Sequence, residues 1–188
     1  MKRNVKKDLI MAPMPVLIIG TYDKDGVPNA MNAAWGTQCD GDAITIFLSR
    51  HKTTENLKLK NAFTVAFATR GTLIASDYFG IESGTKINKI EKAGFHAIKA
   101  EHVDAPIFVE YPVTLECEVL EMADDEDGYR LVGKVVNVVA DDAVLDERGR
   151  IDLGKMQVIS YDSSLHAYRV IGDVVGDAFC DGLTIKNR

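Results

Sequence analysis

The feature that most constrains the fold of this chain is a pair of long, alternating stretches joined by an acidic turn. Residues 113–121 place Glu on one face and apolar side chains on the other, and residues 129–139 form a matching stretch rich in Val. A period of two is typical of a half-buried strand, so we expect a long antiparallel hairpin. The acidic run at 124–128 lacks the twelve-residue spacing and distal Glu of a calcium loop, which favours a solvated turn.

Further short strands and little helix surround this hairpin. Residues 15–22 are apolar and rich in β-branched side chains, and the Asp-Gly pair at 25–26 predicts a turn with a return strand from about Val27. Similar runs predict strands at 43–48 and 62–68. The expected helices are short, at 54–60, 73–79 and 87–93. Because long helices do not alternate with the strands, the pattern indicates an antiparallel barrel and not a doubly wound sheet.

Composition limits the size and class of the protein. A chain of 188 residues with 46% hydrophobic content can form one substantial core, so we expect a single domain over residues 1–188. The formal charge of −6 argues against nucleic-acid binding, which needs a basic surface. Pro13 and Pro15 interrupt the apolar stretch near the N-terminus, so we expect neither a signal peptide nor a membrane span.

The cysteines and histidines do not suggest a metal site. Cys39, Cys117 and Cys180 lie far apart and form no CxxC pair, so neither a zinc motif nor a disulfide framework is indicated, and a reducing cytoplasm fits best. The histidines lack the i, i+4 spacing of metal ligands. Cys39 has two interpretations, a redox-active thiol or a small buried hydrophobe.

A basic segment follows the strand predicted at 43–48. It consists of Ser49, Arg50, His51, Lys52, Thr53 and Thr54. Free backbone N–H groups at a helix start, the helix dipole and cationic side chains would all point at one spot, which is how proteins hold a phosphate. The alternative is an ordinary solvated loop, because basic clusters are usually surface.

A second segment has unusually small side chains for a strand. It consists of Asn32, Ala33, Ala34, Trp35, Gly36 and Thr37. Small residues in a strand let a planar ligand or another backbone approach closely. Trp35 is the only tryptophan, and its default role would be that of a core or interface anchor.

The order of these segments resembles the flavin reductase-like proteins of the FMN-binding split barrel, in particular their flavoredoxin branch. The resemblance spans almost the whole chain. It rests on the entry hairpin at 15–30, the small-residue segment, Lys52-Thr53-Thr54-Glu55-Asn56-Leu57, Asp77-Tyr78-Phe79-Gly80, Ser83-Gly84 with Lys89, Ala105-Pro106 with Glu110 and Leu115-Glu116-Cys117, and Tyr168 with Gly172, Val175-Gly176, Phe179 and Gly182.

This resemblance implies a mainly β fold, an antiparallel, Greek-key-like split barrel of about six core strands with a few short helices. It also implies a homodimer that binds FMN non-covalently near the subunit interface. By the same resemblance, residues 32–37 face the flavin ring, residues 49–54 hold the phosphate, and Lys89 reaches the flavin or its phosphate. The family usually has an Asp before this lysine, whereas the chain has Asn88.

The function that the resemblance implies is that of an FMN-dependent oxidoreductase, supplied with electrons by NAD(P)H or a redox protein. A flavoredoxin-type carrier between protein partners, without a small-molecule substrate, is the alternative. A third possibility is a relative that has lost flavin and keeps the barrel for another ligand or haem. The chain has no GxGxxG fingerprint of a nicotinamide-binding domain, and no residue is assigned as catalytic because flavin chemistry requires proximity more than side-chain acid–base work.

Overall fold

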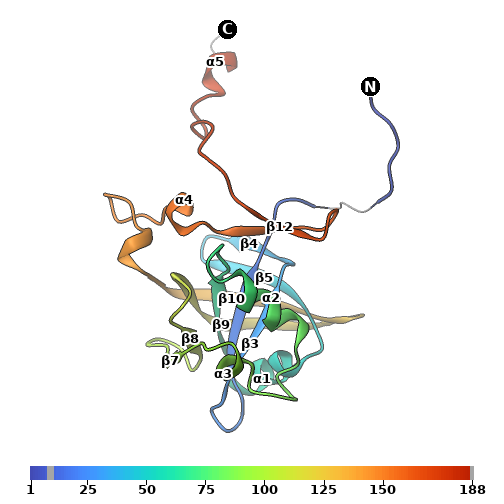
Figure 1. Ribbon diagram of the computed structural model, residues 1–188, viewed down its shortest axis with the longest axis vertical. Coiled ribbons are helices and arrows are strands. Elements are labelled where there is room, and N and C mark those ends of the chain that lie inside the picture. Colours follow the sequence, from blue (N-terminus) through green and yellow to red (C-terminus); the bar gives the residue numbers. More distant parts are fainter. Residues whose placement is uncertain (8–10, 187–188) are drawn as a thin grey trace.

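The computed structural model describes residues 1–7 and 11–186, and its main element is a seven-stranded antiparallel sheet (Figure 1). The strand order is β3-β2-β6-β9-β10-β5-β4. The bounds are β2 Leu17–Tyr22, β3 Pro28–Ala33, β4 Gly36–Asp40, β5 Ala43–Ser49, β6 Ala62–Phe67, β9 Val113–Asp125 and β10 Gly128–Ala140. The predicted mainly β, antiparallel architecture is confirmed, with β4 as an added edge strand.

The smaller elements lie around this sheet. A second sheet consists of β1 Met14–Pro15, β11 Ile159–Asp162 and β12 Ala167–Val170, and a third of β7 Ala97–Lys99 and β8 Pro106–Phe108. The helices are α1 Lys52–Lys60, α2 Leu73–Ile81, α3 Lys89–Lys92, α4 Leu153–Met156 and α5 Leu183–Lys186, with a 3₁₀ turn η1 at Asp142–Val144. None of the helices in the described ranges is long and apolar enough to cross a membrane.

The β9–β10 hairpin is longer than predicted. Pairing continues to Asp125 opposite Gly128, so the first residues of the acidic run belong to β9 and only the turn itself is unpaired. Gly128 also pairs with Ser49 of β5, and a Cβ at Gly128 would lie 2.1 Å from the Leu48 carbonyl oxygen. The strand therefore continues because three backbones meet closely at this glycine.

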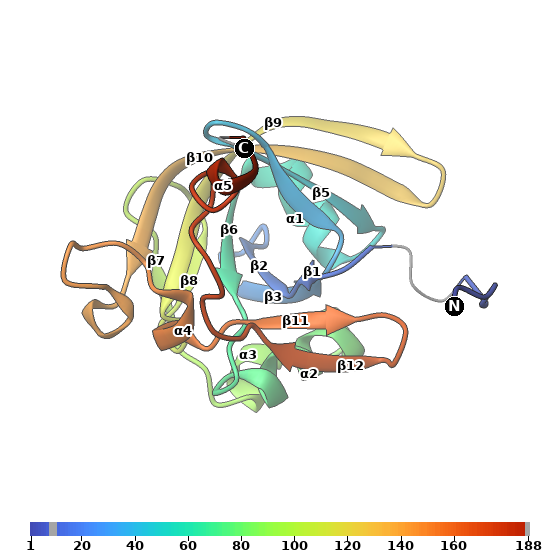
Figure 2. The ribbon, with the colours of Figure 1, turned by 90° about the horizontal axis from the view of Figure 1, so that it is seen from above.

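The sheet curves around a core that α1 covers at one end (Figure 2). Ile19, Phe63 and Leu131 are fully buried in this core, and α1 packs on β2, β3 and β6 and contributes Leu57. The helix begins at Lys52 and not at Thr54 as expected. The backbone N–H of His51 donates to Thr54 Oγ1 at 2.9 Å, and that hydroxyl donates to the His51 carbonyl at 2.8 Å, so His51 becomes the N-cap.

A second cluster of buried side chains lies between the sheet and α2. It contains Ile18, Phe79 and Phe108. Asn32 Nδ2 of β3 donates to the Ser76 carbonyl of α2 at 2.9 Å, and a Cβ at Gly80 would lie 3.3 Å from the Asn32 Cβ. Part of the small-residue segment therefore admits another backbone, one of the two roles that the sequence left open.

The predicted helix and strand limits differ from the structure in three further places. Helix α2 ends at Ile81 and not at Phe79, and α3 is confined to Lys89–Lys92 within the expected 87–93. The small-residue segment is not one strand, because β3 ends at Ala33 and β4 begins at Gly36. A Cβ at Gly36 would lie 2.8 Å from Leu17 Cδ1, so this glycine is explained by packing against β2.

Candidate functional site

Three lysines from separate parts of the chain line one cavity of about 210 Å³. Lys52 opens α1, Lys86 lies in the loop after α2, and Lys89 opens α3. Pro28 and Asn29, at the start of β3, form another wall. We call this site the lysine cavity. Its cations make it suited to an anion.

Lys89 is buried and ties down the end of α2. Its Nζ donates to the Phe79 carbonyl at 2.8 Å and to the Glu82 carbonyl at 3.0 Å. Carbonyls at a helix C-terminus lack intrahelical donors, so an ammonium group satisfies them well. Burial lowers the pKa of Lys89 to about 8, with the nearby Glu82 opposing and Lys52 adding to the decrease.

Lys52 has weaker ties to the protein. Its Nζ lies 3.1 Å from Asp23 Oδ2 and 3.4 Å from the Gly84 carbonyl. Burial acts against ionisation of Asp23, but bonds from the Val27 N–H and Lys52 outweigh it and hold the pKa of that carboxyl below its usual value. Asp23 therefore stays charged and compensates part of the positive charge of the cavity.

The two threonine hydroxyls of the basic segment bind the protein. Thr53 Oγ1 accepts from Asn29 Nδ2 at 2.8 Å, and Thr54 Oγ1 forms the cap with His51 described above. Both side chains are buried. The backbone N–H groups of Lys52 and Thr53 lie in the first turn of α1, where a helix has no intrahelical acceptors for them.

Arg50 lies in a different cluster, formed around Tyr129 of β10. Its guanidinium contacts the Tyr129 hydroxyl, lies 4.6 Å from the ring centroid and is 3.2 Å from Asp124 Oδ1. Lys58 Nζ lies 2.7 Å from the same hydroxyl and 4.5 Å from the same centroid. We call Arg50, Lys58, Tyr129 and Asp124 the Tyr129 clamp. The structure thus separates Arg50 from Lys52, although the sequence treats them as one site.

The small-residue segment reaches the surface at its centre. Ala33 is buried, whereas Trp35 is 63% exposed, so the core role, one of the two default roles of this tryptophan, is wrong. Thr37 is exposed, and its hydroxyl donates to the Gln38 carbonyl at 3.3 Å. The Phe47 N–H donates to the Trp35 carbonyl at 2.8 Å.

The two predicted halves of the site lie along the same strands. Ser49 follows Phe47 by two positions on β5, which corresponds to roughly 7 Å along a strand. Likewise β3 runs from Asn29, at the lysine cavity, to Ala33, next to the Ala34–Trp35 connection. His51 is exposed at the N-cap, between Arg50 of the clamp and Lys52 of the cavity.

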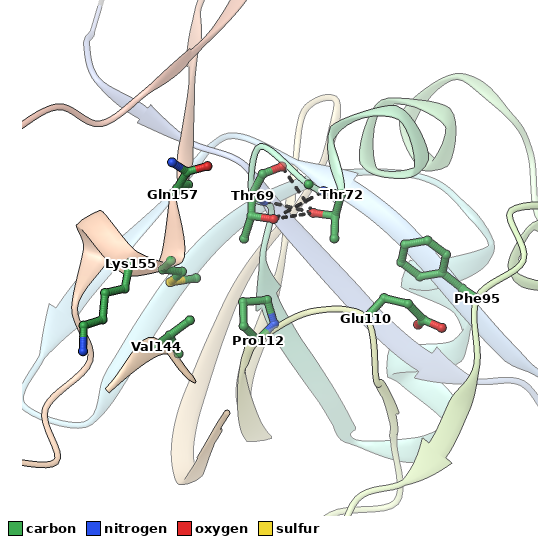
Figure 3. Close-up of a pocket in the computed structure, with 10 residues that line it drawn as sticks. Thr69, Thr72, Phe95, Glu110, Pro112, Val144, Lys155 and Gln157 are labelled. Atoms are coloured by element: carbon green, nitrogen blue, oxygen red, sulfur yellow. Dashed lines mark hydrogen bonds between the residues drawn. The ribbon is translucent and has the colours of Figure 1, made fainter. Parts of the chain in front are cut away.

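A larger cavity, of about 530 Å³, has no residue of the predicted site (Figure 3). Thr69 and Thr72 bond to each other there, and Lys155 Nζ donates to the Leu145 carbonyl at 2.6 Å. Glu110 Oε1 accepts from His96, while its Oε2 is buried and has no partner among the described residues. An unpaired carboxylate oxygen repels a phosphate, so the smaller lysine cavity is the better anion site despite its size.

Comparison with known proteins identifies the family of this chain. A family model described as flavin reductase like domain matches residues 11–159. This chain belongs to that family. The flavoredoxin of Desulfovibrio vulgaris (Miyazaki F) superposes with a TM-score of 0.91 at 28% identity, over 97% of this chain and 100% of the other. The flavoredoxin of Methanosarcina acetivorans superposes with a TM-score of 0.88 at 25% identity, over 98% of this chain and 99% of the other.

A more distant neighbour shares the fold alone. An FMN-binding protein from Thermus thermophilus superposes with a TM-score of 0.76 at 20% identity, over 94% of this chain and 99% of the other. The split-barrel fold expected from the sequence is thereby confirmed. Membership of this family is consistent with a flavin-related redox role.

Sequence reasoning missed three residues that the structure brings to these sites. Lys86 lies in the cavity, Asp23 pairs with Lys52, and Tyr129 holds Arg50. The Asp-Gly turn at 23–26 was a signal for Asp23, since its other oxygen accepts the turn N–H groups of Asp25 and Val27. The buried interpretation of Cys39 is also wrong, because this thiol is exposed on β4.

Proposed function

We propose that this flavin reductase-like protein binds FMN non-covalently and passes electrons or hydride through it. The phosphate lies in the lysine cavity, and the ring lies along residues 32–37. The observation that carries the proposal is the convergence of Lys52 and Lys89 on one cavity beside the first turn of α1. A phosphate there would meet cationic side chains and unpaired backbone N–H groups together.

The donor set fits a phosphorylated flavin in a second way. Asp23 and Glu82 compensate part of the lysine charge, which leaves a net positive cavity for a phosphate dianion. The other residues of the basic segment have supporting roles: Thr54 and His51 form the helix cap and Thr53 anchors Asn29. Ser49 is exposed at the end of β5. Arg50, held in the Tyr129 clamp, adds positive charge near the start of α1.

Residues 32–37 have mostly small side chains, which lets the ring lie close to the backbone. Ala34 has a small side chain, and the exposed Trp35 supplies an aromatic border. When bound, FMN supplies a ring that accepts a hydride or single electrons. The protein's part is to orient that ring and to place N–H donors and cations where negative charge develops.

The electron source divides the proposal into two versions. In the first, NAD(P)H reduces the flavin directly and the protein is a reductase. In the second, favoured by the two flavoredoxins among its structural neighbours, a redox protein supplies the electrons and the chain is a carrier. We place both versions in the cytoplasm, in accord with cysteines that show no paired spacing.

Spectroscopy tests the proposal in two steps. The purified protein should be yellow, and its flavin absorption should survive gel filtration. A colourless protein that takes up no added FMN would contradict the cofactor assignment. Anaerobic mixing then distinguishes the versions: bleaching by NADH or NADPH supports a reductase, and bleaching only by a reduced ferredoxin supports a carrier.

A further inference from the structure

Lys89 differs from the other two lysines of the lysine cavity because it is buried. Lys52 is only partly covered, and Lys86 is exposed. An ammonium group loses hydration when it is buried, which favours the neutral amine. Burial accordingly lowers the pKa of Lys89 to about 8, with Glu82 opposing this change and Lys52 adding to it. At pH 7 about one Lys89 side chain in ten is therefore a neutral amine, the nucleophilic form of lysine.

Two backbone carbonyls at the end of α2 orient this amine. Its Nζ donates to the Phe79 carbonyl at 2.8 Å and to the Glu82 carbonyl at 3.0 Å. A neutral amine has two hydrogens and one lone pair, so these bonds use both hydrogens and leave the lone pair free. Lys89 lines the lysine cavity, whereas Phe79 and Glu82 do not. The carbonyls therefore hold the amine from one side, and a reactant reaches it from the cavity.

The same cavity can hold an anion beside the amine. Lys52 and Lys86 both line it, and none of the described residues that line it is acidic. Asp23 compensates Lys52 from outside, at 3.1 Å. Cationic side chains around an open volume bind a phosphate well. A molecule with both a phosphate and a carbonyl group would thus be held by its phosphate next to a nucleophile, which raises the effective concentration of the carbonyl.

We propose that Lys89 of the flavin-free protein is a covalent modification site for small phosphorylated aldehydes. The Nζ lone pair adds to the aldehyde carbon and forms a carbon–nitrogen bond. The carbonyl oxygen then leaves as water with the two amine hydrogens, and an imine remains. A proton from solvent converts the imine to its cationic form, whose single N–H donates to one of the two α2 carbonyls. The step needs no oxidant and no reductant.

The modification and FMN would exclude each other. The lysine cavity has a volume of about 210 Å³, which is small even for one bound molecule. It does not hold the FMN phosphate together with a second phosphorylated molecule. The aldehyde would therefore keep the protein free of flavin. This exclusion rests on the proposed function, whereas the modification requires only that the lysine cavity binds an anion.

The test uses pyridoxal 5′-phosphate, which is an aldehyde with a phosphate, and pyridoxal, the same aldehyde without it. The full chain is freed of flavin by dialysis against bromide and mixed with either probe. Borohydride then adds hydride to the imine carbon and fixes the adduct as a secondary amine, which peptide mass spectrometry locates. Lys89 should be labelled at about tenfold lower concentration of the phosphorylated probe. Labelling should increase from pH 7 to pH 9, and FMN added first should prevent it.

The chain contains its own control lysine, and two variants extend the test. Lys24 is exposed on the turn after β2, and its bond to Asp25 raises its pKa, so it should remain unlabelled. Lys89→Arg keeps the positive charge but cannot form an imine, so it should lose the label and retain FMN. Lys52→Met keeps the reactive amine but should require about tenfold more of the phosphorylated probe.

The outcomes separate the modification from the proposed function. Labels spread over exposed lysines, or equal labelling by the two probes, would overturn the modification. A protein that binds FMN but is never labelled at Lys89 would also overturn it and leave the proposed function standing. A protein that takes up no FMN but is labelled at Lys89 would refute the proposed function alone. A label that bound FMN does not prevent would overturn the exclusion of the two ligands.

Discussion

The lysine cavity and the Tyr129 clamp lie on the two flanks of the same helix start, and both are basic. In the clamp, Arg50 and Lys58 already share a phenol ring, its hydroxyl and the Asp124 carboxylate. In the cavity, Lys89 bonds to two backbone carbonyls, whereas Lys52 pairs with Asp23 and bonds to the Gly84 carbonyl, and both lysines line an open volume. The difference teaches that positive charge alone does not make an anion site. An anion site requires cations whose charge is only partly compensated by nearby carboxylates and which surround an open cavity.

Removing a cavity cation should have the largest effect. Lys52→Met should weaken FMN by about 10- to 150-fold, since a charge-assisted hydrogen bond contributes roughly 1.5–3 kcal/mol. Riboflavin, which lacks the phosphate, should bind nearly as before. Quenching of flavin fluorescence during titration measures both dissociation constants. Lys24→Met is the control, because Lys24 is an exposed lysine on the neighbouring turn. Equal losses for the two flavins would place the phosphate elsewhere.

Tyr129→Phe tests the clamp as a structural unit. The ring remains but the hydroxyl that contacts Arg50 and Lys58 is lost, so the free energy of unfolding should fall by about 1 kcal/mol. The ratio of FMN to riboflavin affinity should stay constant. Urea denaturation gives the first quantity, and combination with Arg50→Met in a double-mutant cycle shows how much belongs to that pair. A selective loss of FMN affinity would make the clamp the anion site.

The pH dependence of FMN binding should report on Lys89. Its pKa in the folded protein is lowered to about 8, so the ammonium is charged below this pH and neutral above it. The contribution of this charge to phosphate binding is therefore present at pH 7 and lost on the way to pH 9, a decrease in affinity of up to about tenfold. Lys89→Arg should remove the bend, because arginine keeps its charge. A flat profile for the unmodified protein would separate Lys89 from the phosphate.

The smallest effect is expected from Arg50. Arg50→Met should change FMN affinity by less than about threefold, because the guanidinium is half exposed and already paired with Asp124. Isothermal titration at two salt concentrations measures this change and its screening. A loss as large as that of Lys52→Met would remove the distinction between cavity and clamp.

The sequence predicts what local pattern controls. The alternation at 113–121 and 129–139 is sufficient for the β9–β10 hairpin, and the apolar run at 15–22 for β2. Helix starts are predicted less well, because the start of α1 depends on a bond between His51 and the Thr54 side chain. The added reach of β9 depends on the close approach of three strands at Gly128, which a single segment does not reveal.

The candidate site is predictable in part for the same reason. The position of Lys52 at a strand-to-helix junction is a local property, and the structure has it there. The meeting of Lys52 with Lys89 depends on where α2 ends and how the next loop returns. Arg50 contacts Tyr129 and not the lysine cavity because of the register between β5 and β10, in which Leu48 lies opposite Tyr129. These partners are determined by tertiary contacts, and the local sequence around Arg50 or Lys52 does not predict them.

The hydrogen bond between Asn29 and Thr53 fixes one end of the distance between the lysine cavity and the Trp35 connection. It fastens the start of β3 to α1 beside the lysine cavity, while the far end of β3 leads into the Trp35 connection. Asn29 and Ala33 are four residues apart on a strand, roughly 13 Å. The Asn29–Thr53 bond is buried, and at the other end the Trp35 carbonyl accepts from the Phe47 N–H, so the spacing between the lysine cavity and the Trp35 side chain is held at both ends. A ligand held at both ends is thereby selected by its span, and shorter or longer analogues should each lose one contact.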